Sequence, residues 1–270
     1  MQADLTNAFI EVAYPVISST SLAASRALGL VIITPAFNRL GLTGMVRGCV
    51  AVAISVPMVL PVFAAFTSMP EHNGFFLAGL MIKEFIIGLM IGLLFGIPFW
   101  AAEVAGELVD LQRGSTMEQL LDPLGQGEAS VMATLLTVML ITLFFMSGGF
   151  ILMVDGYYHS YQLWPVTAFT PIFSGASLNS VLAILDQVMR IGVLMIAPLI
   201  VSMLITDLML AYLSRMAPSL HIFDLSLPVK NLFFSVLMVI YIGFLIPVML
   251  DQLAQFRGTV EVLKSLAGDT

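Results

Sequence analysis

Residues 85–102 read FIIGLMIGLLFGIPFWAA, an uncharged and apolar run between Glu84 and Glu103. A helix crosses the core of a bilayer with about 20 predominantly apolar residues. Runs of this kind recur along the chain, and the gaps between charged residues mark them. They lie at roughly 5–36, 48–70, 85–102, 129–154, 191–206 and 231–250. The sequence therefore predicts about six membrane-type segments.

The composition supports the same class. Of 270 residues, 59% are hydrophobic and only 10% are charged, with a net charge of −7. A soluble domain carries about a quarter charged residues, so this chain has too little polar surface to fold in water. Soluble enzymes, nucleic-acid binders and disordered proteins are thereby excluded. The single cysteine, Cys49, is predicted to be a small buried hydrophobe.

The predicted fold is all-α: a polytopic membrane protein of about six to eight kinked helices and helical hairpins. Kinks are expected because five prolines fall inside the apolar runs, and each removes a backbone donor. These are Pro57, Pro61, Pro98, Pro198 and Pro247. The segment 103–128 holds six acids and one base and is predicted to be a loop. Residues 156–185 predict an interfacial loop followed by a helix that starts near Ser177.

The distribution of positive charges does not indicate which ends of the spans face the cytoplasm. With six spans, four basic residues fall on one side of the membrane and five on the other. An ordinary multi-pass protein shows a clear excess on its cytoplasmic side. We therefore expect either a different number of spans or helices that are not seated as conventional crossings.

Three patterns lie on the predicted helices. Gly88, Gly92 and Gly96 share one face and allow another helix to approach closely, either within the chain or from another subunit. A second pattern places Glu103, Glu107 and Asp110 on one face, which predicts a wet or partner-facing stripe, with proton relay as the alternative. A methionine every seven residues predicts core packing, or else a compliant seal. Those methionines are Met132, Met139, Met146 and Met153, and Gly148-Gly149 interrupts their helix.

Motifs that would indicate catalysis are missing from the sequence. There is no His-Glu-x-x-His, no phosphate-binding Gly-x-x-x-x-Gly-Lys-Ser/Thr and no Gly-x-Ser-x-Gly. The three histidines, His72, His159 and His221, are far apart in sequence. We predict no enzyme activity, no metal site and no cofactor.

Two segments resemble a known family. Residues 105–123 read AGELVDLQRGSTMEQLLDP, and residues 215–230 read RMAPSLHIFDLSLPVK. Both resemble the FliR/SctT family, the membrane component of the export apparatus in flagellar and virulence type III secretion systems. The stretch from Arg26 to Arg47, with Pro35-Ala-Phe, fits the opening pattern of that family. Phe223-Asp-Leu-Ser is more similar to the virulence branch, which we favour over the flagellar one.

The resemblance implies a subunit of a helical export gate in the bacterial inner membrane. Its expected partners are two smaller membrane components (SctR/FliP-like and SctS/FliQ-like), a switch protein (SctU/FlhB-like) and the unfolded substrate proteins. In chain order, residues 1–128 would form an N-terminal helical half that ends in a plug loop. Residues 129–270 would form a C-terminal half with a 207–230 loop and a short tail.

The resemblance also implies where the site residues lie. Residues 110–127 would plug the closed pore. The residues of this plug are Leu111, Gln112, Gly114, Ser115, Thr116, Met117, Leu120, Leu121, Asp122 and Pro123. The 207–230 loop would face the switch protein through Arg215, Pro218, Phe223, Pro228 and Lys230, although Arg215 and Lys230 could equally be positive anchors at helix ends. The alternative function is a small proton-coupled transporter that uses Glu103, Glu107 or Asp207.

Overall fold

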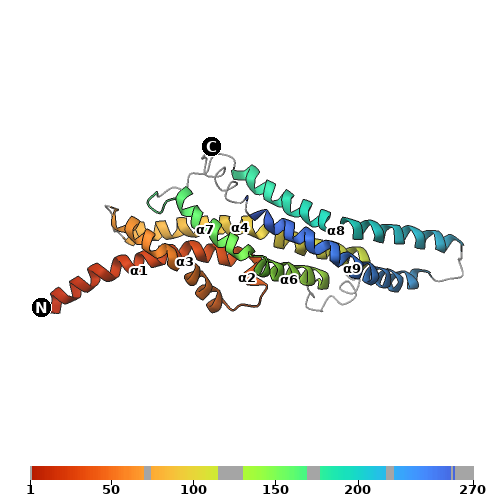
Figure 1. Cartoon of the computed structure of the whole chain (residues 1–270), viewed down its shortest axis with the longest axis horizontal. Helices are drawn as coiled ribbons and strands as arrows, with labels where there is room; N and C mark the ends of the chain where they lie inside the picture. The colour runs from red at the N-terminus through yellow and green to blue at the C-terminus, as the bar shows by residue number, and fades with distance from the viewer. Residues whose placement is uncertain are drawn as a thin grey trace. The chain divides into compact units, whose positions relative to one another are not determined.

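The computed structural model describes residues 2–69, 74–114, 130–168, 177–216, 222–256 and 258. These residues are helical almost throughout and include no strand, which confirms the all-α prediction (Figure 1). The helices are α1 (Gln2–Ile33), α2 (Pro35–Asn38), α3 (Gly44–Thr67), α4 (Gly74–Arg113), α6 (Val131–Met146), α7 (Gly149–Leu163), α8 (Ser177–Met216) and α9 (Ile222–Ala254).

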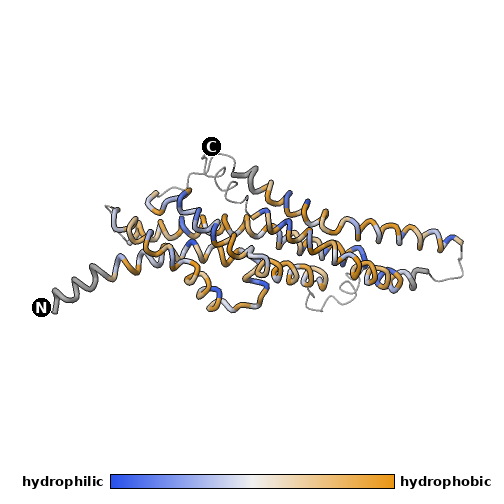
Figure 2. The backbone as a smooth tube through the Cα atoms, viewed as in Figure 1, coloured by the Kyte–Doolittle hydropathy of each residue, from blue (hydrophilic) through white to orange (hydrophobic). Residues whose placement is uncertain are grey.

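Within the described residues, five helices are long and apolar enough to cross a membrane: α1, α3, α4, α8 and α9. A sixth span is reached if α6 and α7, which a short break separates, form one crossing. Figure 2 shows mostly apolar residues along α4, α6, α8 and α9, whereas α7 carries more polar residues. The prediction of about six membrane-type segments is confirmed.

The helices are longer than the sequence predicted. α4 continues to Arg113, so residues 103–113 are helical instead of belonging to a 103–128 loop. α8 extends to Met216 and α9 begins at Ile222, which leaves little of the predicted 207–230 loop. α7 runs to Leu163 across the aromatic residues that were predicted to form an interfacial loop. In each case, polar side chains interrupt the apolar run without interrupting the backbone hydrogen bonds of the helix.

The break between α6 and α7 was predicted correctly. Gly148 has φ +80°, a left-handed conformation that glycine adopts without steric cost, and it caps the start of α7. The single helix expected over 129–154 is therefore two helices. The start of α8 at Ser177 also agrees with the prediction.

The chain forms two compact units. Unit 1 consists of Met1–Gly96, Gly148–Leu182 and Gln255–Thr270, and unit 2 consists of Ile97–Ser147 and Ala183–Ala254. Helix α4 contributes to both units and is 67% buried over its apolar window, whereas α9 is only 17% buried. The predicted halves, residues 1–128 and 129–270, describe the order of the chain and are a different division from these two units.

Glycines bring α1 and α4 together in unit 1. A Cβ added at Gly88 would collide with the backbone carbonyl of Arg26, and one at Gly92 would come within 2.8 Å of the Leu30 carbonyl oxygen. From the opposite side, a Cβ at Gly29 would come within 2.8 Å of the Leu89 nitrogen. The two helices thus touch backbone to backbone. Gly88 and Gly92 serve the within-chain contact that the sequence left open, while subunit packing at Gly96 stays a prediction.

An apolar cluster lies beside this contact. It joins buried side chains of α1, α3 and α4, together with residues that follow α3 and α7. Its members are Leu22, Ala23, Val62, Phe66, Met69, Leu80 and Val166. α1 therefore packs against α3 as well as against α4.

The glycine contact yields a prediction about stability. Gly88→Val should lower the free energy of unfolding by roughly 3 kcal/mol, because the added atoms meet backbone that has no rotamer to change. Gly48→Val is the matched control, since a Cβ at Gly48 meets no described atom within 4 Å. The midpoint of thermal unfolding in detergent measures both. Equal losses in the two variants would contradict the packing assignment.

Candidate functional site

Asp110, in the last turns of α4, binds residues on both sides of the candidate plug segment. Its Oδ1 accepts a hydrogen bond from Nε of Arg113 at 2.7 Å. Its Oδ2 accepts from the Ser130 hydroxyl at 2.6 Å and from the backbone N–H of Met132 at 3.1 Å. The carboxylate therefore binds Arg113, which precedes segment 115–129, and Ser130 and Met132, which follow it.

Ser130 also begins the next helix. Its hydroxyl oxygen accepts from the backbone N–H of Ala133 and so forms the N-cap of α6. Helices α4 and α6 are also in close contact here, because a Cβ added at Gly106 on α4 would collide with the backbone of Ala133 on α6. The start of α6 is thus held against α4 by hydrogen bonds and by backbone contact.

The N-terminal part of α9 packs on the end of α4. The guanidinium of Arg113 lies 5.4 Å from the ring centroid of Phe234, a cation–π distance. Gly114 has φ +82°, and a Cβ there would lie 2.8 Å from a methyl group of Leu227. Arg113 and Gly114 therefore lie against one face of α9, whereas Leu111 is exposed.

Asp207 on α8 connects to the same place. Its Oδ1 lies 2.5 Å from Nζ of Lys230, and its Oδ2 accepts a hydrogen bond from the Gln112 amide at 3.4 Å. The Asp207 side chain is 34% exposed and that of Lys230 is 17% exposed. This pair joins α8 and α9 and reaches α4 through Gln112.

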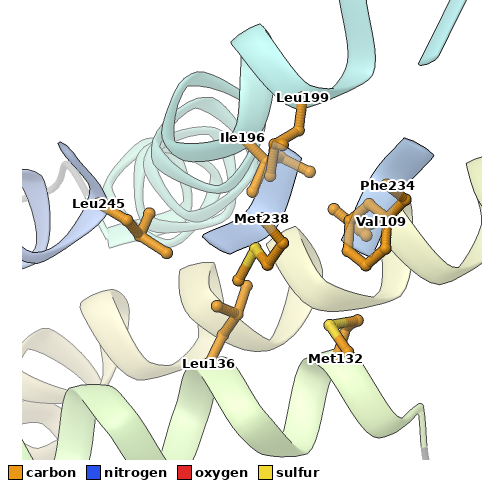
Figure 3. Close-up of a pocket in the computed structure, with 8 residues that line it drawn as sticks. All are labelled: Val109, Met132, Leu136, Ile196, Leu199, Phe234, Met238 and Leu245. Atoms are coloured by element: carbon orange, nitrogen blue, oxygen red, sulfur yellow. The ribbon is translucent and has the colours of Figure 1, made fainter. Parts of the chain in front are cut away.

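A narrow apolar crevice lies beside these polar contacts (Figure 3). Side chains from α4, α6, α8 and α9 line it, and it is too small to hold a water molecule. The lining residues are Val109, Met132, Leu136, Ile196, Leu199, Phe234, Met238 and Leu245. The polar contacts around Asp110 therefore adjoin a narrow apolar crevice that cannot hold a water molecule.

The structure describes part of the predicted site. Leu111 is exposed, and Gln112 and Gly114 make the contacts given above. The remaining plug residues lie outside the described residues: Ser115, Thr116, Met117, Leu120, Leu121, Asp122 and Pro123. Their role in a plug stays a prediction.

The residues predicted to contact the switch protein fall into three groups. Arg215 and Pro228 are exposed on α8 and α9. Lys230 is partly buried and paired with Asp207, so it is more than a positive anchor at a helix end. Pro218 and the side chain of Phe223 lie outside the described residues.

Three further predictions need correction. Asp110 is buried inside the chain, because three donors replace its water, so it does not belong to a wet stripe with the exposed Glu107. The methionines do not form one continuous stripe, since the break at Gly148 separates the exposed Met146 from the buried Met153. Cys49 is exposed, because α3 leaves much of its apolar surface uncovered by the described chain.

Sequence reasoning missed a buried network of charges in unit 1. Arg26, fully buried on α1, donates from Nε to Glu84 on α4 at 2.6 Å. It also donates to the Ser160 hydroxyl at 3.0 Å and to the Trp164 carbonyl at 2.8 Å. Lys83 pairs with the other oxygen of Glu84 at 2.7 Å. Three charges thus share one buried site.

Lys83 extends this network to the segment after α7. Its ammonium donates to the backbone carbonyls of Pro165, Val166 and Ala168 at 2.9–3.2 Å. The Arg26 guanidinium also stacks on the ring of Tyr161, 3.8 Å from its centroid. The only signal in the sequence was the presence of three charges in apolar surroundings, which does not reveal their pairing.

Comparison with known proteins shows what the chain is similar to. Residues 17–256 match the family described as bacterial export proteins, family 1. The chain is 40% identical over 186 residues to Yop proteins translocation protein T of Yersinia pestis, covering 68% of this chain and 71% of that protein. It is 31% identical over 230 residues to surface presentation of antigens protein SpaR of Salmonella typhimurium, covering 84% and 86%. It is 30% identical over 207 residues to flagellar biosynthetic protein FliR of Pectobacterium carotovorum, covering 76% of each.

The contribution of the buried charge network to the stability of the protein can be tested by substitution. Glu84→Gln should lower the free energy of unfolding by about 3–5 kcal/mol, because it leaves two buried cations without a counter-charge. Asp155→Asn is the matched control, since the Asp155 carboxylate is 57% exposed, and its loss should cost less than about 0.5 kcal/mol. Thermal unfolding in detergent measures both variants. A similar midpoint for the two would show that the network is not a stabilising unit.

Proposed function

This chain belongs to the bacterial export proteins, family 1, and we propose that it is the export-apparatus subunit of a type III secretion system that closes the entry gate for unfolded proteins. It is a multi-pass protein of the bacterial inner membrane. The names of its relatives support an export role, since they refer to translocation of Yop proteins, to surface presentation of antigens and to flagellar biosynthesis. The higher identity to the Yersinia protein favours the virulence branch.

One observation carries the gate proposal: the base of segment 115–129 is held at a single carboxylate. Asp110 binds Arg113 before the segment and Ser130 after it. A segment anchored in this way can leave a pore and return while the helices that carry it keep their packing. Met117, Leu120 and Leu121 supply apolar bulk that can occlude a channel without binding a polar substrate tightly.

A gate of this kind must meet two opposing demands. At rest it has to hold back ions, and in use it has to admit an unfolded chain. Gly114 has a positive φ at the point where the segment leaves α4, which suits a sharp change in chain direction. The proposed plug therefore combines a base held at Asp110 with a turn at Gly114, where the chain leaves α4.

The proposal includes no catalytic step. Export in this view depends on a pore built with partner subunits, namely the two smaller membrane components and the switch protein. α3, α8 and α9 expose apolar side chains along much of their length, and such surface is available to neighbouring subunits as well as to lipid. In this proposal, the chain forms one part of the wall of a pore that several subunits build together.

A proton-coupled transporter is the alternative. It would require an acid that can take up and release protons within the membrane. Among the acids named for this role, Asp207 is paired with Lys230 and Glu107 is exposed. These environments favour the export subunit.

Deletion of residues 114–121 tests the plug. In cells that contain the complete export apparatus, the deletion should leave assembly intact and make the membrane leaky to ions, because the occluding side chains are removed. A dye that reports membrane potential measures the leak, and native gel electrophoresis measures assembly. The control removes the same number of residues from the C-terminal end, 263–270, and should stay tight. A tight membrane with 114–121 deleted would disprove the plug.

Purification tests the partner set. The tagged full chain, extracted in mild detergent, should co-purify with two smaller hydrophobic proteins in fixed ratios, as mass spectrometry of the complex can establish. A transporter would instead be a homomer with transport activity after reconstitution alone. Recovery of such an active homomer would overturn the export proposal.

A further inference from the structure

We propose that Lys230 and Asp207 form a latch that positions the last turn of α4 and thereby couples the α8–α9 hairpin to the gate. The latch comprises Lys230, Asp207 and the Gln112 amide that binds Asp207. This inference rests on the proposed function, because it describes how the base of the plug is regulated. It assigns a positioning role to Asp207.

The pair lies at matched depth in a helical hairpin. Asp207 is nine residues before the end of α8 at Met216, and Lys230 is eight residues after the start of α9 at Ile222. With a rise of 1.5 Å per residue, Asp207 lies about 14 Å from the end of α8 and Lys230 about 12 Å from the start of α9. Figure 1 shows α8 and α9 running side by side. Their ion pair therefore reports the register of one helix against the other.

One face of α9 bears on the end of α4. Leu227, Lys230 and Phe234 are three and four residues apart, a spacing that places them on the same side of a helix. Leu227 contacts Gly114, and Phe234 lies under the guanidinium of Arg113. Lys230 acts on the same turn through Asp207 and Gln112.

A shift of this face would therefore move the residues from which the plug leaves. The Asp110 anchor is nearly fully buried and holds three hydrogen bonds, which makes it a fixed point. Asp207 is more exposed than Asp110, at 34% against 3%. Among the described residues, Asp207 also has fewer partners, since only Lys230 and Gln112 bind it. Exposed ion pairs are weaker than buried ones and break more readily. The latch is thus the reversible member of the two.

The packing beside the latch allows such a movement. Phe234 and Met238 of α9 line the narrow apolar crevice together with Val109 of α4. The side chains that line this crevice are all apolar, so a small displacement along it breaks no hydrogen bond between them. Pro228 precedes the latch on α9 and removes one backbone hydrogen bond from that turn. A partner bound at the outer end of the hairpin could therefore change the position of this face.

Two single substitutions and their charge swap test the latch in cells with the complete export apparatus. Asp207→Asn and Lys230→Gln should each raise the resting ion leak about threefold or more, while native gels show normal assembly. The double variant D207K/K230D should return the leak to that of the parent, because the pair is restored and Gln112 can accept as well as donate. Exposed residues on the same helices serve as matched controls, with Arg190→Gln on α8 and Asp251→Asn on α9.

The possible outcomes separate this inference from the proposed function. If the single variants stay tight while deletion of 114–121 leaks, the latch is wrong and the plug stands. If that deletion stays tight, the plug itself is wrong. If the single variants leak only because assembly is lost, the pair has a structural role in assembly and no role in positioning α4. If the charge swap does not restore a tight membrane, the ion pair between residues 207 and 230 does not control the leak. Either result overturns the latch.

Discussion

Buried charge pairing on apolar helices is the constraint on which the rest of this structure depends. An ionised side chain removed from water is costly unless a counter-charge or several hydrogen-bond donors take the place of water. Glu84, Asp110 and Asp207 each have a cation beside them. The cation beside Asp110 is Arg113 of the same helix, so there the hydrogen bond from Ser130 joins α4 to the start of α6. Glu84 joins α1 to α4, whereas Asp207 joins α8 to α9. The few charges of the chain thus determine how its apolar helices are matched.

Close backbone packing complements these pairs. Apolar side chains are attracted to lipid tails as much as to each other, so helices in a membrane need close approach to associate. Gly29, Gly88 and Gly92 provide it between α1 and α4, next to the Arg26–Glu84 pair. Gly106 provides it between α4 and α6, next to the Asp110 anchor. In both units, a tight contact places a carboxylate within reach of its partners.

The arrangement separates rigid from adjustable parts. The Arg26 network is buried and suits a permanent frame, and Asp110 is hydrogen-bonded to residues on both sides of the proposed plug segment. The Lys230–Asp207 pair is partly exposed and lies on helices that leave most of their surface uncovered. The proposed export gate would need both kinds of contact, because its wall must persist while its closure is released.

The sequence alone determined the class of the protein, the approximate number of spans and the family, because apolar run length and the two motif blocks are local properties of the chain. It also located the break at Gly148-Gly149 and the start of α8. It failed at 103–113 and 207–216, where charged residues suggested loops, although the helices continue. Only the tertiary structure decided which charges pair, since Arg26 and Glu84 are 58 residues apart. That pairing depends on which helix faces meet, and no local pattern of residues contains that information.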